Sequence, residues 1–163
     1  MNTRTQFINT TGALLLLLSL SPAANAAFID NGDGTVTDTV TGLMWDQCSQ
    51  GQSGSACATG AATEMTWSAA LTAVVTAINA NYKGHVDWRL PNKNELESLV
   101  DIAAAPAIDS TAFPATWLNG PYWSSTTYTP NTAGVWVVEF YYGQLFFRGK
   151  AGSHAVRLVR SGQ

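Results

Sequence analysis

A leucine-rich run near the N-terminus limits how much of this chain can fold into a domain. Arg4 precedes the run, residues 14–18 are all leucine, and the small residues Ala24 and Ala26 follow. This order is typical of a secretory signal peptide that is cleaved after a small residue. The run is shorter than the ~20 apolar residues that cross a bilayer. We therefore expect residues 1–26 to be a cleaved signal peptide, with no integral membrane span and a periplasmic or extracellular mature protein.

Residues 27–163 have the length of one ordinary domain. The whole chain has a net charge of −3, and its eleven acidic residues all precede Phe140. Such a balance gives no general attraction to nucleic acid, so we expect no nucleic-acid partner. A local basic surface is still expected, because the charged residues after Phe140 are all cations: Arg148, Lys150, Arg157 and Arg160.

The two cysteines, Cys48 and Cys57, lie close together in a segment rich in glycine, serine and glutamine. Exported proteins meet an oxidising environment in which such a pair is normally joined. We expect one disulfide that closes a surface loop.

The first half of the mature chain predicts short strands followed by two helices. Residues 28–38 are typical of a hairpin with a tight turn, and residues 41–45 of another turn and strand. Thr66 is a good N-cap for an amphipathic helix over about 67–80. Asn92 and Glu95 have the spacing of a capping box that begins a second helix. The helical spacing predicts two buried stripes: Trp67, Leu71, Val74 and Ile78 in the first helix, and Leu96, Leu99, Val100 and Ala103 in the second.

The second half predicts strands over residues 122–126, 135–140, 145–148 and 155–160, rich in aromatic and β-branched residues. Strands, then two helices, then an antiparallel run indicate an α+β domain.

Six short motifs occur in order between about Asn31 and Arg160: DNGDGTVTDTVTGLMW, TWSAAL, DWRLPNKNELESLVD, YWSST, VWVVEFYYGQ and AVRLVR. Together they resemble the bacterial family named for the C-terminal domain of the Legionella collagen-like adhesin. The resemblance implies a single C-type-lectin-like domain, with two helices packed on a twisted, mostly antiparallel sheet and the N- and C-terminal strands close together. It also implies a binding role, because the named adhesin's domain is associated with sulfated glycosaminoglycans.

Seven residues inside these motifs are expected to brace the fold, with the arginines paired to carboxylates such as Asp87 or Asp101. They are Trp45, Trp88, Arg89, Pro91, Glu95, Trp123 and Arg157.

Motifs for catalysis or metal binding are absent from the sequence. The Glu-Pro-Asn, Gln-Pro-Asp and Trp-Asn-Asp motifs of calcium-dependent lectins do not occur. The oxygen-rich turn at residues 30–34 lacks EF-hand spacing, which favours a plain hairpin turn and leaves calcium binding open. His85 and His154 have no partners at metal-ligand spacing. We expect no catalytic residue, no cofactor and no metal site, and hence a protein that is not an enzyme.

The remaining candidates point to ligand binding. Arg148 and Lys150 lie outside the tightest motifs in a glycine-containing loop, which favours contact with an anionic ligand. Tyr128, Tyr141 and Tyr142 fall at loops or turns, where their rings can stack on sugars. We expect an exported adhesin-like module that recognises a carbohydrate, such as a sulfated glycan, or another surface ligand. The alternative is a structural or protein–protein assembly module of the cell envelope, including a homo-oligomer.

Overall fold

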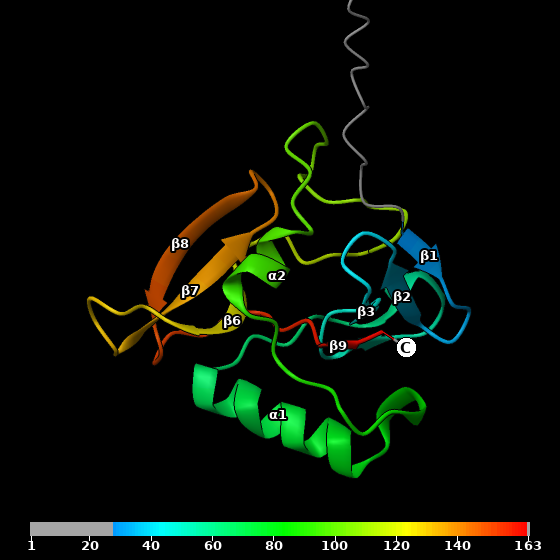
Figure 1. Cartoon of the computed structure of the whole chain (residues 1–163), viewed down its shortest axis with the longest axis horizontal. Coiled ribbons are helices and arrows are strands. Elements are labelled where there is room, and N and C mark those ends of the chain that lie inside the picture. Colours follow the sequence, from blue (N-terminus) through cyan, green and yellow to red (C-terminus); the bar gives the residue numbers. More distant parts are fainter. Residues whose placement is uncertain (1–27, 163) are drawn as a thin grey trace, which may run out of the picture.

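The computed structural model describes residues 28–162, and the predicted signal peptide lies outside them. The described chain has two main sheets, one on either side of the core, with one long helix below them in Figure 1. None of the helices within residues 28–162 is long and apolar enough to cross a membrane.

The first sheet joins the two ends of the described chain. Its four antiparallel strands lie in the order β1 (Phe28–Asp30), β2 (Thr35–Asp38), β3 (Leu43–Asp46) and β9 (Val159–Ser161). Val36, Trp45 and Val159 are partners across three neighbouring strands, and all three are fully buried. The inner face of this sheet therefore forms one wall of the core.

The predicted hairpin at residues 28–38 is confirmed, and its turn is stabilised by its own side chains. Asp30 Oδ1 accepts the Gly32 amide at 2.8 Å, and Asp33 Oδ1 accepts the Thr35 amide at 2.9 Å. Bonds of this kind let aspartate hold a tight turn without outside help.

The second sheet is built from consecutive hairpins: β6 (Tyr122–Thr127), β7 (Gly134–Glu139) and β8 (Gln144–Gly149). A two-stranded ribbon of β4 (Gln52–Ser53) and β5 (Thr59–Gly60) forms the third sheet. The α+β class is thus confirmed, but the single twisted sheet of the prediction is wrong. Short strands separated by long loops divide it into three small sheets.

The Cys48–Cys57 disulfide is present and closes a loop that contains β4 and the 3-10 helix η1 (Ser55–Cys57), with β5 just after it. Both cysteines are buried, at 3 % and 1 % exposed. Between them, residues 51 and 53–56 are exposed. The bridge therefore closes a surface loop, as predicted, and its buried sulfurs tie that loop to the body of the domain.

Helix α1 (Trp67–Asn79) matches the predicted helix to within a residue, and the Thr66 side chain accepts the Ala69 amide as its N-cap. Its predicted buried stripe is shifted. Ala70 and Ala77 are buried, whereas Leu71 is 38 % exposed. The small alanines let the helix backbone approach a layer of large rings, which include Trp88 and Trp123.

Helix α2 (Lys93–Glu97) has the predicted capping box between Asn92 and Glu95 but is much shorter than expected. The Ser98 hydroxyl donates to the Glu95 carbonyl at 2.7 Å where the helix ends. Leu99 is buried in the turns that follow, and Ala103 is exposed. Between the two helices, the 3-10 helix η2 (Tyr82–Gly84) leads into the WRLP motif.

The motif residues expected to brace the fold do so through partners that partly differ from the prediction. Arg160 binds Asp87 at 2.7 Å as expected, but Arg89 pairs with Glu95 rather than with an aspartate. Trp45, Trp88 and Trp123 are 0 to 1 % exposed, and Pro91 is buried.

Arg157 is the largest departure, because it is fully buried without an ion pair among residues 28–162. Its Nη1 donates to the carbonyl oxygens of Asp46 and Gln47, and its Nη2 donates to Thr116 Oγ1 at 2.9 Å. The guanidinium also lies 4.6 Å from the ring centroid of Phe113. It joins the C-terminal segment to two loops that lie far away in sequence.

The closing strand was predicted over residues 155–160, but β9 begins only at Val159. Residues before it lie on single bridges: His154 opposite Met65, and Ala155 parallel to Tyr122. The C-terminal segment thus passes from the second sheet to the first, and a continuous pairing with one sheet is lost.

Candidate ligand-binding grooves

The most exposed aromatic side chains lie on the turn between β7 and β8. Tyr141 and Tyr142 are 52 % and 71 % exposed, and their ring centroids are 4.6 Å apart at an angle of 76°. Both rings follow Phe140, which is fully buried and anchors the end of β7. Large apolar groups that stay in water in a group commonly mark a contact surface. We call Tyr141 and Tyr142 the tyrosine pair.

The backbone of this turn is tightly held. The two carboxylate oxygens of Glu139 accept the amides of Tyr141 at 2.5 Å and Tyr142 at 3.0 Å. Gly143 follows with φ of +70°, and a Cβ there would lie 2.7 Å from Val100 Cγ1. Glycine is needed both for this backbone angle and for the close approach to the loop beneath. The backbone that carries the tyrosine pair is therefore held in one conformation.

Two grooves flank the tyrosine pair. The polar groove, of about 840 Å³, lies between the 118–120 loop and β8, and it includes Asn119, Gln144 and Arg148. The apolar groove, of about 430 Å³, lies over the 104–107 loop and is bordered by Ile102. Ile102 is 86 % exposed, although it is a large aliphatic side chain. Both grooves are lined by both tyrosines, so a ligand lying across the tyrosine pair would touch both.

Arg148 provides positive charge in the polar groove. Its guanidinium lies 4.3 Å from the ring centroid of Phe146, and it makes no ion pair within residues 28–162. Its Nη1 donates at 3.3 Å to the Phe147 carbonyl oxygen, which leaves other guanidinium donors for an incoming acceptor. A stacked arginine with spare donors suits a carboxylate or sulfate, which it can bind through two parallel bonds.

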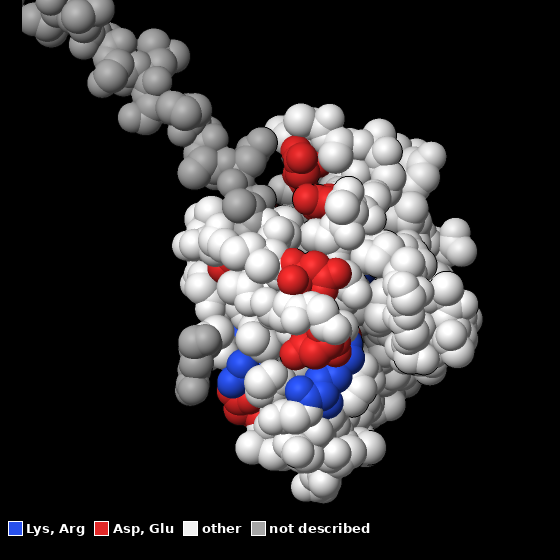
Figure 2. All heavy atoms as spheres, turned by 90° about the vertical axis from the view of Figure 1, so that its right-hand side faces the viewer, with Lys and Arg blue, Asp and Glu red and all other residues white. Residues whose placement is uncertain are grey.

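The cations near the four-stranded sheet differ from Arg148, because they are paired with opposite charges. Figure 2 shows the side of the molecule that carries the four-stranded sheet, where acidic side chains form a column and basic side chains lie beside acidic ones. Two cations of this half are neutralised in ion pairs, Lys83 with Asp46 and Arg160 with Asp87, both at 2.7 Å. Arg148 lies outside such a pair, on a strand of the other sheet.

The structure separates the five predicted ligand residues into three places. Tyr141, Tyr142 and Arg148 meet at the polar groove. Lys150 lies beyond the end of β8, with its Nζ 4.5 Å from the ring centroid of Trp67. Tyr128 stacks on Phe147 at 4.2 Å between centroids. Because neighbouring residues of a strand point to opposite faces, Phe147 and Tyr128 lie on the face of β8 opposite Phe146 and Arg148.

Sequence reasoning missed the loops that complete the grooves. Residues 104–107 and 118–120 form walls of the grooves, and nothing in their composition marks them as such. Ile102 offered a signal, since an apolar residue beyond the helical stripe is a candidate for the surface.

A third hollow, of about 670 Å³, lies beside the N-terminal hairpin turn and includes Asp30, Asp33 and Lys83. Hydrogen bonds from Thr35 outweigh a small effect of burial and lower the pKa of Asp33 below its usual range. These carboxylates already accept the amides of their own turn. Within residues 28–162, no group of three or more histidine, cysteine, aspartate or glutamate side chains is placed to hold a metal ion.

Comparison with known proteins gives one family. The model for the Lcl C-terminal domain matches residues 34–160, which include the tyrosine pair, both groove loops and the disulfide. No curated protein matches the chain.

Proposed function

Because the chain belongs to the Lcl C-terminal domain family, we propose that it is an adhesin-like surface module that recognises an extended carbohydrate across the tyrosine pair. The observation that carries the proposal is the exposure of Tyr141 and Tyr142 on a rigid turn between two grooves. The apolar faces of sugar rings pack on aromatic side chains, and tyrosine adds a hydroxyl at the rim.

The polar groove supplies groups that complement sugar substituents. Asn119 and Gln144 carry amides that can donate to and accept from hydroxyls. Arg148 can bind a sulfate or carboxylate on the same chain. We propose a sulfated or carboxylated glycan as the ligand class, held weakly, because one exposed cation is screened by salt.

We also propose that the module is not an enzyme. Among the described residues, Glu139 is the one carboxylate that lines either groove, and its contacts support this proposal. Both of its oxygens accept amides of the turn, so they are occupied in holding the backbone rather than being free to take up a proton.

The export signal and the C-type-lectin-like fold belong to the same proposal. The disulfide supports passage through an oxidising compartment. The terminal strands β1 and β9 lie in one sheet, separated by β2 and β3, which supports the predicted closeness of the two chain ends.

The test is a glycan array with the mature protein, followed by titration of the best ligand against three variants. Tyr142→Ala should weaken binding about tenfold, and Arg148→Ala about threefold. Lys150→Ala is the matched control, because this cation lies outside both grooves. Raising the salt concentration should weaken the wild type more than Arg148→Ala. Equal affinities for wild type and Tyr142→Ala would remove the tyrosine pair from the site.

The exposure of Ile102 favours a second candidate, a protein–protein assembly module in which the apolar groove receives a partner. Silence on the glycan array, together with an oligomer in solution that Ile102→Ser dissociates, would establish this alternative.

A further inference from the structure

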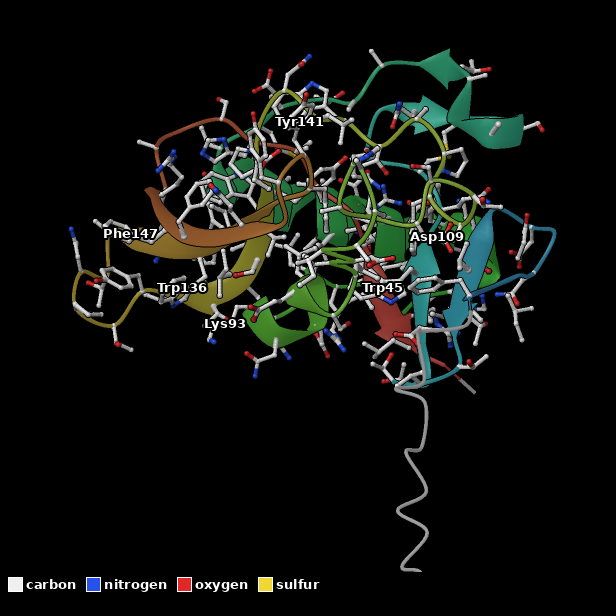
Figure 3. The ribbon with its side chains drawn as sticks, turned by 90° about the horizontal axis from the view of Figure 1, so that it is seen from above. Trp45, Lys93, Asp109, Trp136, Tyr141 and Phe147 are labelled. Carbon is white, nitrogen blue, oxygen red and sulfur yellow. A yellow bond between two sulfur atoms is a disulfide. The ribbon has the colours of Figure 1, made fainter. Side chains whose placement is uncertain are left out.

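Three aromatic rings meet on the face of the second sheet that is turned away from Arg148. Trp136 in β7 and Phe147 in β8 are cross-strand partners. The Tyr128 ring lies parallel to Phe147, with 4.2 Å between centroids and 2° between planes, and edge-on to Trp136 at 5.3 Å. We call Tyr128, Trp136 and Phe147 the aromatic platform. Figure 3 shows Trp136, Phe147 and Lys93 side by side at one end of the molecule.

The platform remains uncovered because helix α2 begins beside it and runs away from it. Leu96 of α2 packs with Val138 and Leu145, one pair further along the same sheet face. The helix begins at Lys93, which lies beside Trp136, and it runs towards Val138. The rings therefore lie at the N-terminal end of the helix and are left half-buried, with Phe147 45 % exposed. Leaving an aromatic side chain in water forgoes roughly 1.5–3 kcal/mol of burial. The rings are fixed by one another rather than by the core.

The size of the platform selects a small ligand. Aromatic side chains bury about 150–250 Å² each, so three half-covered rings offer on the order of 300 Å². A stable protein interface needs about 800 Å² from each partner. A single sugar ring, by contrast, is matched to a surface of this extent.

The charge around the platform selects a neutral ligand. Lys93 lies at the edge, with its Nζ 5.6 Å from the Trp136 ring centroid. Glu97 is four residues later on the same helix face, where opposite charges offset each other. Lys93 makes no ion pair within residues 28–162, so its ammonium can still donate hydrogen bonds. The platform therefore combines flat apolar rings, no local excess of charge and one donor at the rim.

We propose that the aromatic platform is a second binding site, for the apolar face of a neutral hexopyranose, with Lys93 donating to a ring hydroxyl. The tyrosine pair and Arg148 lie elsewhere on the hairpin and are not needed for this site. The two sites can therefore be occupied together, and binding here does not depend on the proposed function of the grooves.

The test is saturation-transfer NMR on the mature protein, with methyl β-D-galactopyranoside as the probe. The hydrogens on C3, C4 and C5 of this sugar share one face, and they should receive the strongest saturation. The signal should be lost in Phe147→Ala and kept in Phe147→Trp. It should also persist in Tyr142→Ala and at high salt, which separates this site from the grooves.

A second variant guards against simple misfolding. Lys93→Met keeps the apolar contact with Trp136 but removes the donor, and it should weaken binding severalfold with an unchanged melting temperature. Absence of saturation in the wild type would overturn the proposal, as would equal saturation in Phe147→Ala or loss of signal at high salt. A dimer that dissociates in Phe147→Ala would also overturn it, because a second copy would then cover the platform.

Discussion

Arg89 and Glu95 form a bidentate ion pair, with 2.7 Å between Nη1 and Oε2 and 2.8 Å between Nη2 and Oε1. The same carboxylate accepts the Asn92 amide at 2.8 Å and so completes the capping box of α2. One side chain thus connects the strand-like WRLP segment to the helix that follows it.

This pair predicts a pH-dependent stability. Burial alone would raise the pKa of Glu95, but hydrogen bonds from Arg89 and Asn92, together with the charge of Arg89, lower it below its ordinary value of 4.5. A lowered pKa contributes stability that is full above pH 4.5 and is lost as the pH falls through the folded-state value. Glu95→Gln keeps an acceptor for the Asn92 amide but loses the charge. It should cost about 1 kcal/mol at neutral pH, and less towards about pH 3.

Denaturant titrations of wild type and Glu95→Gln at the two pH values measure this difference. Glu97→Gln is the control, because Glu97 is exposed on the same helix and makes no ion pair within residues 28–162. A difference that stays constant with pH would contradict the assignment.

Replacement of Arg157 should be severely destabilising. Desolvation lowers the pKa of its guanidinium, and the charge is held by carbonyl and hydroxyl oxygens instead of a carboxylate. Arg157→Met would leave the carbonyls of Asp46 and Gln47 without this donor in the core, at a cost of about 3–5 kcal/mol. Arg157→Lys should not rescue it, since one ammonium cannot replace the planar fork. Urea unfolding compares Arg157→Met and Arg157→Lys with Arg148→Lys, a control at an exposed position. A loss of stability no larger than that of the control would refute the structural role of Arg157.

The segment from Trp88 to Asn92 allows the stability contributed by core packing to be compared with that contributed by helix capping. Trp88 is 1 % exposed, and its Nε1 donates to the Tyr82 carbonyl at 2.8 Å. Trp88→Ala should cost about 3–5 kcal/mol through the cavity that it creates. Asn92→Ala removes only the acceptor for two helix amides and should cost about 1 kcal/mol. Thermal melts of both variants give the ratio of the two losses of stability. Similar losses would argue against the buried position of Trp88.

Reduction of the disulfide should weaken the domain without unfolding it. Closing a loop with a sequence separation of 9 removes chain entropy worth about 2–3 kcal/mol from the unfolded state. The double variant Cys48→Ser, Cys57→Ser should show a loss of this size and keep its near-UV circular dichroism. Thiol labelling of the unreduced, denatured wild type should find no free cysteine, and two labelled cysteines would disprove the bridge in solution.

The elements with local signals were predictable from the sequence. The hairpin at residues 28–38 contains its own turn residues. Helix α1 begins at the Thr66 cap, and helix α2 begins at the Asn92–Glu95 capping box. Each of these signals is carried by a few neighbouring residues. The length of α2 and the division into three sheets were not predictable in this way, because they depend on contacts between distant segments.

The candidate site shows the same limit. Exposed tyrosines at a turn could be read from their position, and so could the unpaired cation at Arg148. Lys150 looked equivalent to Arg148 in sequence, yet its carbonyl oxygen accepts the Trp67 amide and its ammonium lies over the Trp67 ring. Trp136 alternates with buried residues along its strand, yet it is only half-buried, because helix α2 begins beside it and covers the sheet further along, at Val138.

The pairing of β3 with β9 has a consequence for how the chain can be made. Leu43 lies opposite Ser161, so the first sheet gains its last strand only when the final residues of the domain are available. Long-range pairings of this kind form late, because a large loop of chain must close first. A nascent chain that emerges N-terminus first therefore cannot complete the sheet around Trp45 before residues 159–161 have emerged. A chain that ended before Val159 would leave Met44 and Trp45 without their partners on β9.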